Sequence, residues 1–235
     1  MEIRENIESY MRDLKAWITS TKDTPLEDMD AFFTRRLEGY EAHMLENWAE
    51  GYRYLASILP EGVETLLDLG CGTGLELDAI FRRSPGLRVT GIDLSQAMLE
   101  QLRRKHAGRQ LRLLCGSYFE VPFPGPFDAV ISFESLHHFT AAEKLPLFQK
   151  ICRALTPGGV FINSDYYACC EEEETLLREV CDRRRQHAGI PAGHFIHFDT
   201  PLTPEHEMQV LYEAGFREVR LDHTVSGATT ILAAK

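Results

Sequence analysis

The spacing of hydrophobic positions changes at about residue 63. Before it, apolar side chains recur at steps of three and four, a spacing that gathers them on one face of a helix. This spacing predicts three helices, over residues 3–18, 32–48 and 52–59, the last of which ends at Pro60. Each helix needs a partner for its apolar face, so we expect residues 1–60 to form an N-terminal helical cap on a larger domain.

After residue 63, short apolar runs alternate with helical segments, which is typical of a parallel β-sheet with crossover helices. Strands are predicted at Val63–Leu69, Leu87–Asp93, Leu111–Cys115, Phe127–Phe133, Val160–Asp165, Glu218–His223 and Thr229–Ala233. Helices are predicted at residues 75–83, 96–106, 141–155, 171–185 and 204–214, with a kink at Pro146. We therefore predict one α/β domain, Rossmann-like and doubly wound, over residues 61–235.

The loop after the first predicted strand carries the strongest chemical signal. Residues 68–74 read Asp-Leu-Gly-Cys-Gly-Thr-Gly and lead directly into a helix. Glycines let the backbone turn sharply and let a ligand approach it closely, and the helix start offers unpaired amide donors. Asp93 ends the next strand about 20 residues later, where an acid accepts hydrogen bonds from ribose hydroxyls. Together these motifs predict a nucleotide-like ligand; the alternative is a tight turn followed by an aspartate that caps a helix.

Through these motifs the sequence resembles the class I S-adenosylmethionine-dependent methyltransferases, as it does through residues 127–133, 136–139 and 155–159. The resemblance extends over Val63–Phe161 and implies a seven-stranded sheet that is mostly parallel, with an antiparallel last strand. It also implies S-adenosyl-L-methionine as the cofactor. The cofactor-binding residues that it implies are Asp68, Gly70, Cys71, Gly72, Gly74, Asp93, Leu94, Met98, Ser117, Tyr118 and Phe133.

Two places in the chain bear on the choice of cofactor. Many members of this family have an acid after the third strand that binds the adenine amine, whereas this chain has Ser117 and Tyr118 there. A nicotinamide cofactor is the rival for such a fold, but its pyrophosphate favours G-x-G-x-x-G, and Leu75 stands where the third glycine belongs. The loop therefore favours a ligand without phosphate.

The resemblance implies methyl transfer, here expected to reach an oxygen, nitrogen or sulfur nucleophile of a small molecule. The sulfonium of the cofactor is already activated, so the protein's main task is to align the acceptor with the methyl group. Two alternatives stay open. One is the transfer of another alkyl group from a modified cofactor, and the other is a non-catalytic module that senses S-adenosyl-L-methionine.

Four histidines are candidate catalytic residues. His137 and His138 follow the fourth predicted strand, at the edge where doubly wound sheets bind ligands, with a packing role as the alternative. His194 and His197 belong to an aromatic loop over residues 189–203 that is a candidate lid. A lone H-x-x-H is weak evidence for a metal site, so no metal is expected.

The predicted cap has two interpretations. Phe33, Arg36, Tyr40 and His43 would face an acceptor pocket if these helices cover the ligand site. The same aromatic face would otherwise pack on the sheet domain or form a homodimer with a second copy of the chain.

Composition narrows the choice of partner and compartment. The net charge of −11 repels phosphate backbones and anionic lipid headgroups, so no nucleic acid and no membrane partner is expected. The first residues do not resemble a signal peptide, and no apolar run approaches the roughly 20 residues of a membrane span, so a cytoplasmic location is expected. The six cysteines are expected to be reduced. For the adjacent Cys169 and Cys170, binding of a soft electrophile or metal is the alternative to burial as thiols.

Overall fold

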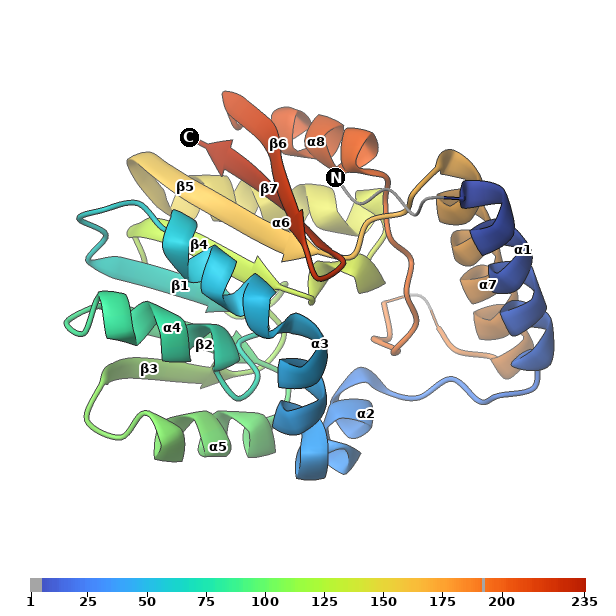
Figure 1. The fold of residues 1–235 in the computed structure, drawn as a ribbon, viewed down its shortest axis with the longest axis horizontal. Helices are drawn as coiled ribbons and strands as arrows, with labels where there is room; N and C mark the ends of the chain where they lie inside the picture. Colours follow the sequence, from blue (N-terminus) through green and yellow to red (C-terminus); the bar gives the residue numbers. More distant parts are fainter. Residues whose placement is uncertain (1–5, 192) are drawn as a thin grey trace.

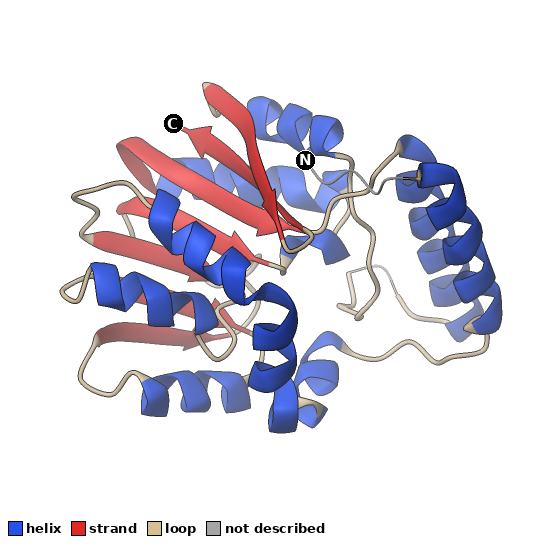
Figure 2. Ribbon diagram, viewed as in Figure 1, coloured by secondary structure: helices blue, strands red, loops and turns tan. Residues whose placement is uncertain are grey.

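A seven-stranded sheet forms the centre of the molecule, with helices on both of its faces (Figure 1, Figure 2). The computed structural model describes residues 6–191 and 193–235, so Ile3 of the first predicted helix lies outside the described residues. The strands are β1 (Thr65–Leu69), β2 (Arg88–Asp93), β3 (Gln110–Cys115), β4 (Phe127–Phe133), β5 (Leu155–Asp165), β6 (Glu218–Val225) and β7 (Ala228–Ala234). Their order across the sheet is β3-β2-β1-β4-β5-β7-β6.

The directions of the strands confirm the predicted doubly wound sheet. β1 to β5 run parallel to one another, whereas β7 runs antiparallel to both β5 and β6. β1 is buried along most of its length, as expected for a strand that is covered by helices on both faces. The largest difference from the predicted strand boundaries is at β5, which begins at Leu155 and not at Val160.

The helices divide between the two faces of the sheet and its edge. They are α1 (Ile7–Ser20), α2 (Met29–Arg35), α3 (Leu37–Ile58), α4 (Leu75–Arg83), α5 (Gln96–Lys105), α6 (Ala141–Ala154), α7 (Glu171–Ala188) and α8 (Pro204–Glu213), with a short 3₁₀ turn η1 (Leu136–His138). The second half of α3 packs with α4 and α5 over one face, and α6 and α8 pack over the other. α6 continues through Pro146.

The N-terminal helices differ from the predicted boundaries. α3 runs to Ile58 without the break that was expected between residues 48 and 52. The chain turns instead at Gly39, whose φ of +82° is a conformation that glycine adopts at little cost. The regular part of α3 therefore begins only after Gly39.

α1 and α7 form a separate pair beside the sheet (Figure 1). Met11 and Leu14 from α1 are buried against Leu177 and Val180 from α7. This contact lies in its own hydrophobic cluster, distinct from the two clusters on the faces of the sheet. The N-terminal segment thus divides, because α1 packs on α7 while the second half of α3 joins the core on one face of the sheet.

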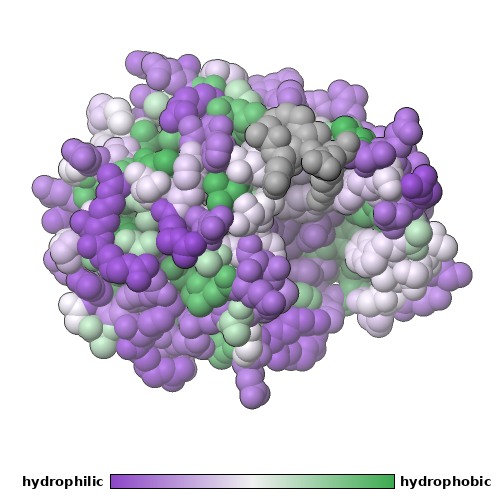
Figure 3. Space-filling model, viewed as in Figure 1, coloured by the Kyte–Doolittle hydropathy of each residue, from purple (hydrophilic) through white to green (hydrophobic). Residues whose placement is uncertain are grey.

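Hydrophilic residues predominate on the face shown in Figure 3, and the surface is hollowed between the sheet-bearing body and the α1–α7 pair. Smaller hydrophobic patches lie between the hydrophilic ones. Within residues 6–191 and 193–235, no helix has the length and apolar character that a membrane crossing needs.

The carboxyl ends of the parallel strands all point toward one edge of the sheet, near α2 and the α1–α7 pair (Figure 1). The chain leaves β1 toward β2 and β3 on one side, and later returns to place β4 and β5 on the other. Doubly wound sheets bind ligands outside the strand ends at such a switch point. The end of β1 and the end of β4 are therefore where a site is expected.

Candidate functional site

The glycine loop after β1 is fixed by hydrogen bonds to β2. Gly70, Gly72 and Gly74 have φ values of +71°, +47° and +72°, which a residue without a Cβ adopts readily. The amide of Gly70 donates to the carbonyl of Ile92 at 2.9 Å, and the amide of Gly72 donates to Oδ2 of Asp93 at 2.8 Å. The loop therefore has a defined shape without any ligand.

Asp93 links this loop to the next helix. Its Oδ1 accepts a hydrogen bond from the amide of Ser95 at 2.8 Å, and the Ser95 side chain caps α5. Burial raises the pKa of Asp93, although the amides of Ser95 and Gly72 oppose the shift. Because a carboxylate oxygen has two lone pairs, each oxygen can accept a further hydrogen bond. The helix-capping role that was the alternative for Asp93 in the sequence belongs to Ser95 in the structure.

A pocket with an empty volume of about 600 Å³, part of it open to solvent, lies in front of the loop. Seven of the residues expected to bind the cofactor line it: Gly70, Gly72, Asp93, Leu94, Met98, Tyr118 and Phe133. A Cβ atom added to Gly72 would come no closer than 3.7 Å to the hydroxyl of Tyr40. The loop thus leaves space in which a ligand can lie against its backbone.

The other four expected residues lie behind the pocket wall, and they are Asp68, Cys71, Gly74 and Ser117. The thiol of Cys71 fills the space beside Gly91, where a Cβ atom would lie only 2.7 Å from the sulfur. The hydroxyl of Ser117 accepts a hydrogen bond from the amide of Phe119 at 3.2 Å. All four residues are buried and do not line the pocket.

Asp68 and Glu76 form a buried pair of acids beneath the loop. Burial raises the pKa of both carboxyl groups, and the charge of Glu76 raises that of Asp68 further. In the described part of the chain, Oδ2 of Asp68 and Oε1 of Glu76 find no hydrogen-bond partner. Buried polar atoms are normally paired, so these two oxygens are exceptions, and neither acid lines the pocket in front of the loop.

A second pocket, with an empty volume of about 1070 Å³, adjoins the first. Four residues line both pockets: Phe33, Tyr40, Glu134 and His138. The remaining lining residues are Phe32, Arg36, Glu38, Gly39, His43, Met44, Trp48, His137 and His197. All four residues that were expected to face an acceptor pocket, from Phe33 to His43, therefore line this second pocket.

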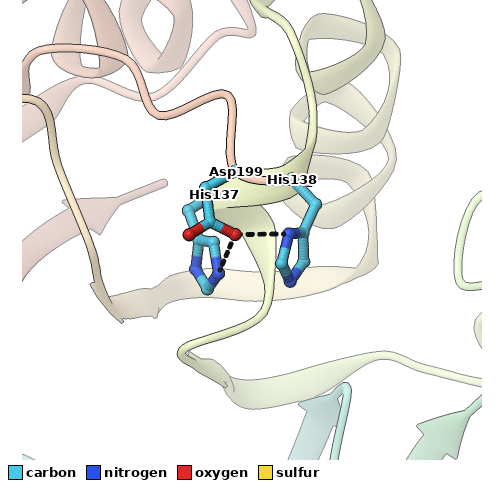
Figure 4. A group of neighbouring side chains, drawn as sticks. All are labelled: His137, His138 and Asp199. Carbon is cyan, nitrogen blue, oxygen red and sulfur yellow. Dashed lines mark ion pairs between the residues drawn. The ribbon is translucent and has the colours of Figure 1, made fainter. Parts of the chain in front are cut away.

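His137, His138 and Asp199 meet at the end of β4 (Figure 4), and the carboxylate of Asp165 contacts His137 as well. Nδ1 of His137 lies 2.6 Å from Oδ1 of Asp165. Oδ1 of Asp199 lies 3.2 Å from Nδ1 of His138 and 3.6 Å from Nε2 of His137. The carboxyl group of Glu134 also lies within 4.8 Å of His137, and burial raises the pKa of Glu134 to about 8.

The charges of this cluster assign different protonation states to the two histidines. Burial lowers the pKa of His137, but Asp165, Asp199 and Glu134 outweigh that effect and raise the pKa to about 9. Burial and the neighbouring charge of His137 lower the pKa of His138. At neutral pH, His137 is therefore a cation and His138 is a neutral imidazole.

The two histidines of the aromatic loop do not come together. His194 lies outside both pockets, with its Nε2 2.6 Å from Oδ1 of Asp28. His197 lines the second pocket, where its ring stacks on Phe32 with the ring centroids 3.4 Å apart and lies near His138. The H-x-x-H pair thus does not converge on one point, and only His197 belongs to the pocket.

Cys169 and Cys170 are free thiols whose sulfur atoms lie 4.0 Å apart. Burial and the neighbouring Glu173 raise the pKa of Cys169 to about 12. Such a thiol stays protonated at neutral pH, and the thiolate is the form that attacks electrophiles and binds metals. This favours a structural role for the pair.

Three acids of the cluster were not predicted as site residues. Glu134 directly follows β4 and has a φ of +48°, which is uncommon for a residue other than glycine and tends to occur at functional sites. Asp165 ends β5, whose carboxyl end lies beside that of β4. Their positions at strand ends were a usable signal. Asp199, on a long loop, offered no such signal.

Comparison with known proteins agrees with this architecture. The methyltransferase domain family matches residues 66–159. An uncharacterized methyltransferase of Geobacillus kaustophilus is 31% identical over 134 residues, which are 57% of this chain and 61% of that protein. The cypemycin N-terminal methyltransferase of a Streptomyces species is 31% identical over 139 residues, 57% of this chain and 56% of that protein. The chain thus spans about three fifths of the length of these curated relatives.

A solved structure shows the same fold at lower sequence identity. It is that of an amino pentose methyltransferase from Micromonospora echinaspora with S-adenosylmethionine bound. Its TM-score is 0.63 at 20% identity, and the match covers 83% of this chain and 95% of that one. The likeness therefore extends over nearly all of a protein of comparable architecture.

Proposed function

Residues 66–159 of this chain form a methyltransferase domain of the class I S-adenosylmethionine-dependent family, and from that premise we propose that the chain methylates a small molecule. The methyl group of S-adenosyl-L-methionine passes directly to an oxygen, nitrogen or sulfur nucleophile of the acceptor. One observation carries the proposal: the pocket in front of the glycine loop meets the second pocket at Glu134 and His138. A cofactor in the first pocket and an acceptor in the second would meet there.

The first pocket offers suitable groups for each part of the cofactor. The backbone at Gly70 and Gly72 leaves room for the methionine portion, and Asp93 has lone pairs for the ribose hydroxyls. Leu94 and Met98 present apolar surface to the adenine. When bound, the cofactor supplies a methyl group on a positively charged sulfur.

The second pocket supports a small acceptor because α2 and the start of α3 enclose it with aromatic side chains. Of the cap proposed for residues 1–60, α2 and the start of α3 cover the second pocket, whereas α1 packs on α7. His137 and His138 give the pocket a polar wall beside the junction, where they contact the acceptor's nucleophile. The Micromonospora enzyme, whose acceptor is an amino pentose, is consistent with a ligand of this size.

Methyl transfer tests the proposal directly. Protein incubated with methyl-labelled S-adenosyl-L-methionine and fractionated metabolites should pass the label to a small molecule, and calorimetry should show binding of S-adenosylhomocysteine. Absence of binding by both cofactor forms would refute the proposal. Binding without transfer to any metabolite would favour a sensing module, and mass spectrometry of the ligand retained on purification would reveal a modified cofactor.

We also propose a homodimer through the N-terminal helices. Ile7 and Trp17 on α1 and Leu45 on α3 are large apolar side chains that are exposed in the single chain. A dimer would remove some of this surface from water. Sedimentation should show a dimer that Trp17→Glu dissociates, whereas a wild-type monomer at high concentration would contradict this proposal.

A further inference from the structure

The donor atoms of His137, His138 and Asp199 are spaced as the ligands of one metal ion would be. All three lie within 4.8 Å of one another, and the carboxylate oxygen is 3.2 Å and 3.6 Å from the two imidazole nitrogens. Zinc ligands lie about 2.0–2.2 Å from the ion, so neighbouring donors in a tetrahedral or octahedral site are about 3.0–3.5 Å apart. The two distances from the carboxylate oxygen to the imidazole nitrogens are within a few tenths of an ångström of this spacing.

Hydrogen bonding does not account for this arrangement. The distance of 3.6 Å between Nε2 of His137 and Oδ1 of Asp199 is too long for a hydrogen bond. Among residues 6–191 and 193–235, no hydrogen-bond partner of this Nε2 is found. His137 lines the second pocket, and its Nε2 forms an ion pair with Asp199 only when the ring is protonated. The nitrogen therefore faces Asp199 across a gap that a bound ion would fill.

Asp165 orients His137 for such a role. Its Oδ1 lies 2.6 Å from Nδ1 of His137, which is shorter than the edge of a coordination polyhedron and suits a charge-assisted hydrogen bond. The same carboxylate accepts hydrogen bonds from the amides of Leu136 and Tyr166, so its oxygens are already occupied. Metal-bound histidines commonly donate their second N–H to a carboxylate in this way. The ion would displace the proton from Nε2 of His137 to solvent, so its binding should weaken as the pH falls.

The donor set also leaves a place for a further ligand. Two imidazoles and one carboxylate are three protein ligands, the number that catalytic zinc sites use while a fourth position stays open. His137 and His138 line the second pocket, and His138 also lines the first. The two histidines thus present the site to the second pocket, while Asp199 lines the cavity beside α1.

From this geometry we propose that His137, His138 and Asp199 bind a divalent transition-metal ion, best matched by zinc, in the wall of the second pocket (Figure 4). Asp165 is the positioning residue that orients His137. If the chain transfers methyl groups as proposed above, the open coordination position takes a lone pair of an oxygen, nitrogen or sulfur atom of the acceptor. The ion site itself stands on the three donors alone.

Metal binding by the full chain tests the site. Protein treated with chelator and then dialysed should bind one zinc ion per chain, and cobalt(II) alone should give visible absorption bands of a tetrahedral or five-coordinate site. Asp199→Asn and His138→Ala should each lower the zinc affinity by more than about 100-fold, beyond the effect expected for an outer carboxylate. Asp182→Asn and His187→Ala are matched controls, because both side chains are exposed on α7.

The role of Asp165 has its own readout. Asp165→Asn should weaken zinc binding by about 10- to 100-fold and shift the cobalt(II) spectrum, while one ion still binds at saturation. A merely structural role would change thermal unfolding without changing the spectrum of the bound ion. Thermal unfolding of every variant shows whether it is folded.

The opposite results would overturn the metal site. Equal zinc affinity of the wild type, Asp199→Asn and His138→Ala would exclude these residues as ligands. A loss of zinc affinity of similar size in the two α7 controls would exclude them as well. Calorimetry with S-adenosylhomocysteine on the same samples separates the two proposals. A chain that binds this nucleoside but no zinc refutes the ion site alone, and one that binds zinc but not the nucleoside refutes the proposed function.

Discussion

At the scale of single residues, the glycine loop and Asp93 behave as one unit. The amide of Gly72 donates to Asp93 at 2.8 Å, so the acid fixes the same backbone against which the ligand is proposed to lie. The second oxygen of Asp93 holds the amide of Ser95 at the start of α5. Removing this carboxylate would therefore affect the loop and the ribose contacts together.

Asp93→Ala is expected to weaken S-adenosylhomocysteine binding by about 1 to 3 kcal/mol, because hydrogen-bond donors of both the loop and the ligand lose their acceptor. Calorimetry at fixed salt measures the change. Asp182→Ala, an exposed carboxylate on α7, should leave the affinity unchanged. Equal affinity of wild type and Asp93→Ala would mean that the carboxylate only accepts the hydrogen bonds from the amides of Gly72 and Ser95.

The site was predictable from the sequence where its residues are close in the chain. The glycine loop is contiguous, and Asp93 follows it at a spacing fixed by one crossover helix, so a motif could identify both. The acids around His137 come from different segments, because Asp165 ends β5 and Asp199 lies in the loop before α8. Only the folded sheet and the path of that loop bring these acids together.

At the scale of elements, the sheet and α1 were predicted well, whereas the boundaries of α2 and α3 were not. Strands of a doubly wound sheet are short apolar runs, which the sequence marks clearly. In α3, however, two glycines have different functions. Gly39 breaks the helix with a positive φ, whereas Gly51 is helical and lets α3 approach the ring of Phe133, since an added Cβ would lie 2.9 Å from that ring. Glycine alone does not distinguish a break from a close contact.

A buried ion pair joins α6 to α8. Lys144 and Glu207 are almost completely buried and lie 2.7 Å apart, and Asn163 of β5 donates to the other oxygen of Glu207. Glu207→Gln should lower the free energy of unfolding by about 3–5 kcal/mol, because it leaves an unpaired buried ammonium group. Adding Lys144→Met should recover part of that loss, since the double variant contains no buried charge. Urea unfolding of the four proteins of this cycle measures the coupling, and simple additivity would contradict it.

Asp128 fastens the start of β4 to the start of β1. It accepts hydrogen bonds from the amides of Glu64 and Thr65 and from the hydroxyl of Thr65. Partial burial raises the pKa of Asp128, but these hydrogen bonds outweigh burial and lower it below the usual 3.8. A lowered pKa in the folded state means that the carboxylate stabilises the fold at neutral pH, and that this stabilisation is lost as the pH falls through the folded value.

Asp128→Asn should therefore be less stable than the wild type at neutral pH, and the difference should shrink as the pH falls below about 3.8. Urea unfolding at several pH values measures both curves. A difference that stays constant down to about pH 2 would show that the charge of Asp128 is not the cause.

At the scale of the whole molecule, the three hydrophobic clusters predict that the α1–α7 pair can open locally while the sheet stays folded. Their contact is a cluster of its own, whereas the sheet has a cluster on each face. Units with few contacts to the rest of a protein often open independently. The proposed acceptor pocket lies next to this pair, because Phe32, Arg36 and His197 line both it and the cavity beside α1.

Leu14→Ala, in the α1–α7 contact, should lower the free energy of local opening by roughly 2 kcal/mol. Hydrogen exchange should then become faster in α1 and α7 but not in β1 or β4. Leu66→Ala, in the sheet core, should accelerate exchange throughout the chain. Uniform acceleration by both substitutions would mean that the α1–α7 pair unfolds only with the sheet.

Asp199 lies on the loop before α8, whereas His137 and His138 belong to η1 at the end of β4. An ion bound by both segments would couple the position of that loop to binding at the end of β4. Thermodynamic reciprocity then applies in both directions. If an acceptor that moves the loop inward raises the affinity of the chain for the ion by some factor, the ion must raise the affinity for that acceptor by the same factor.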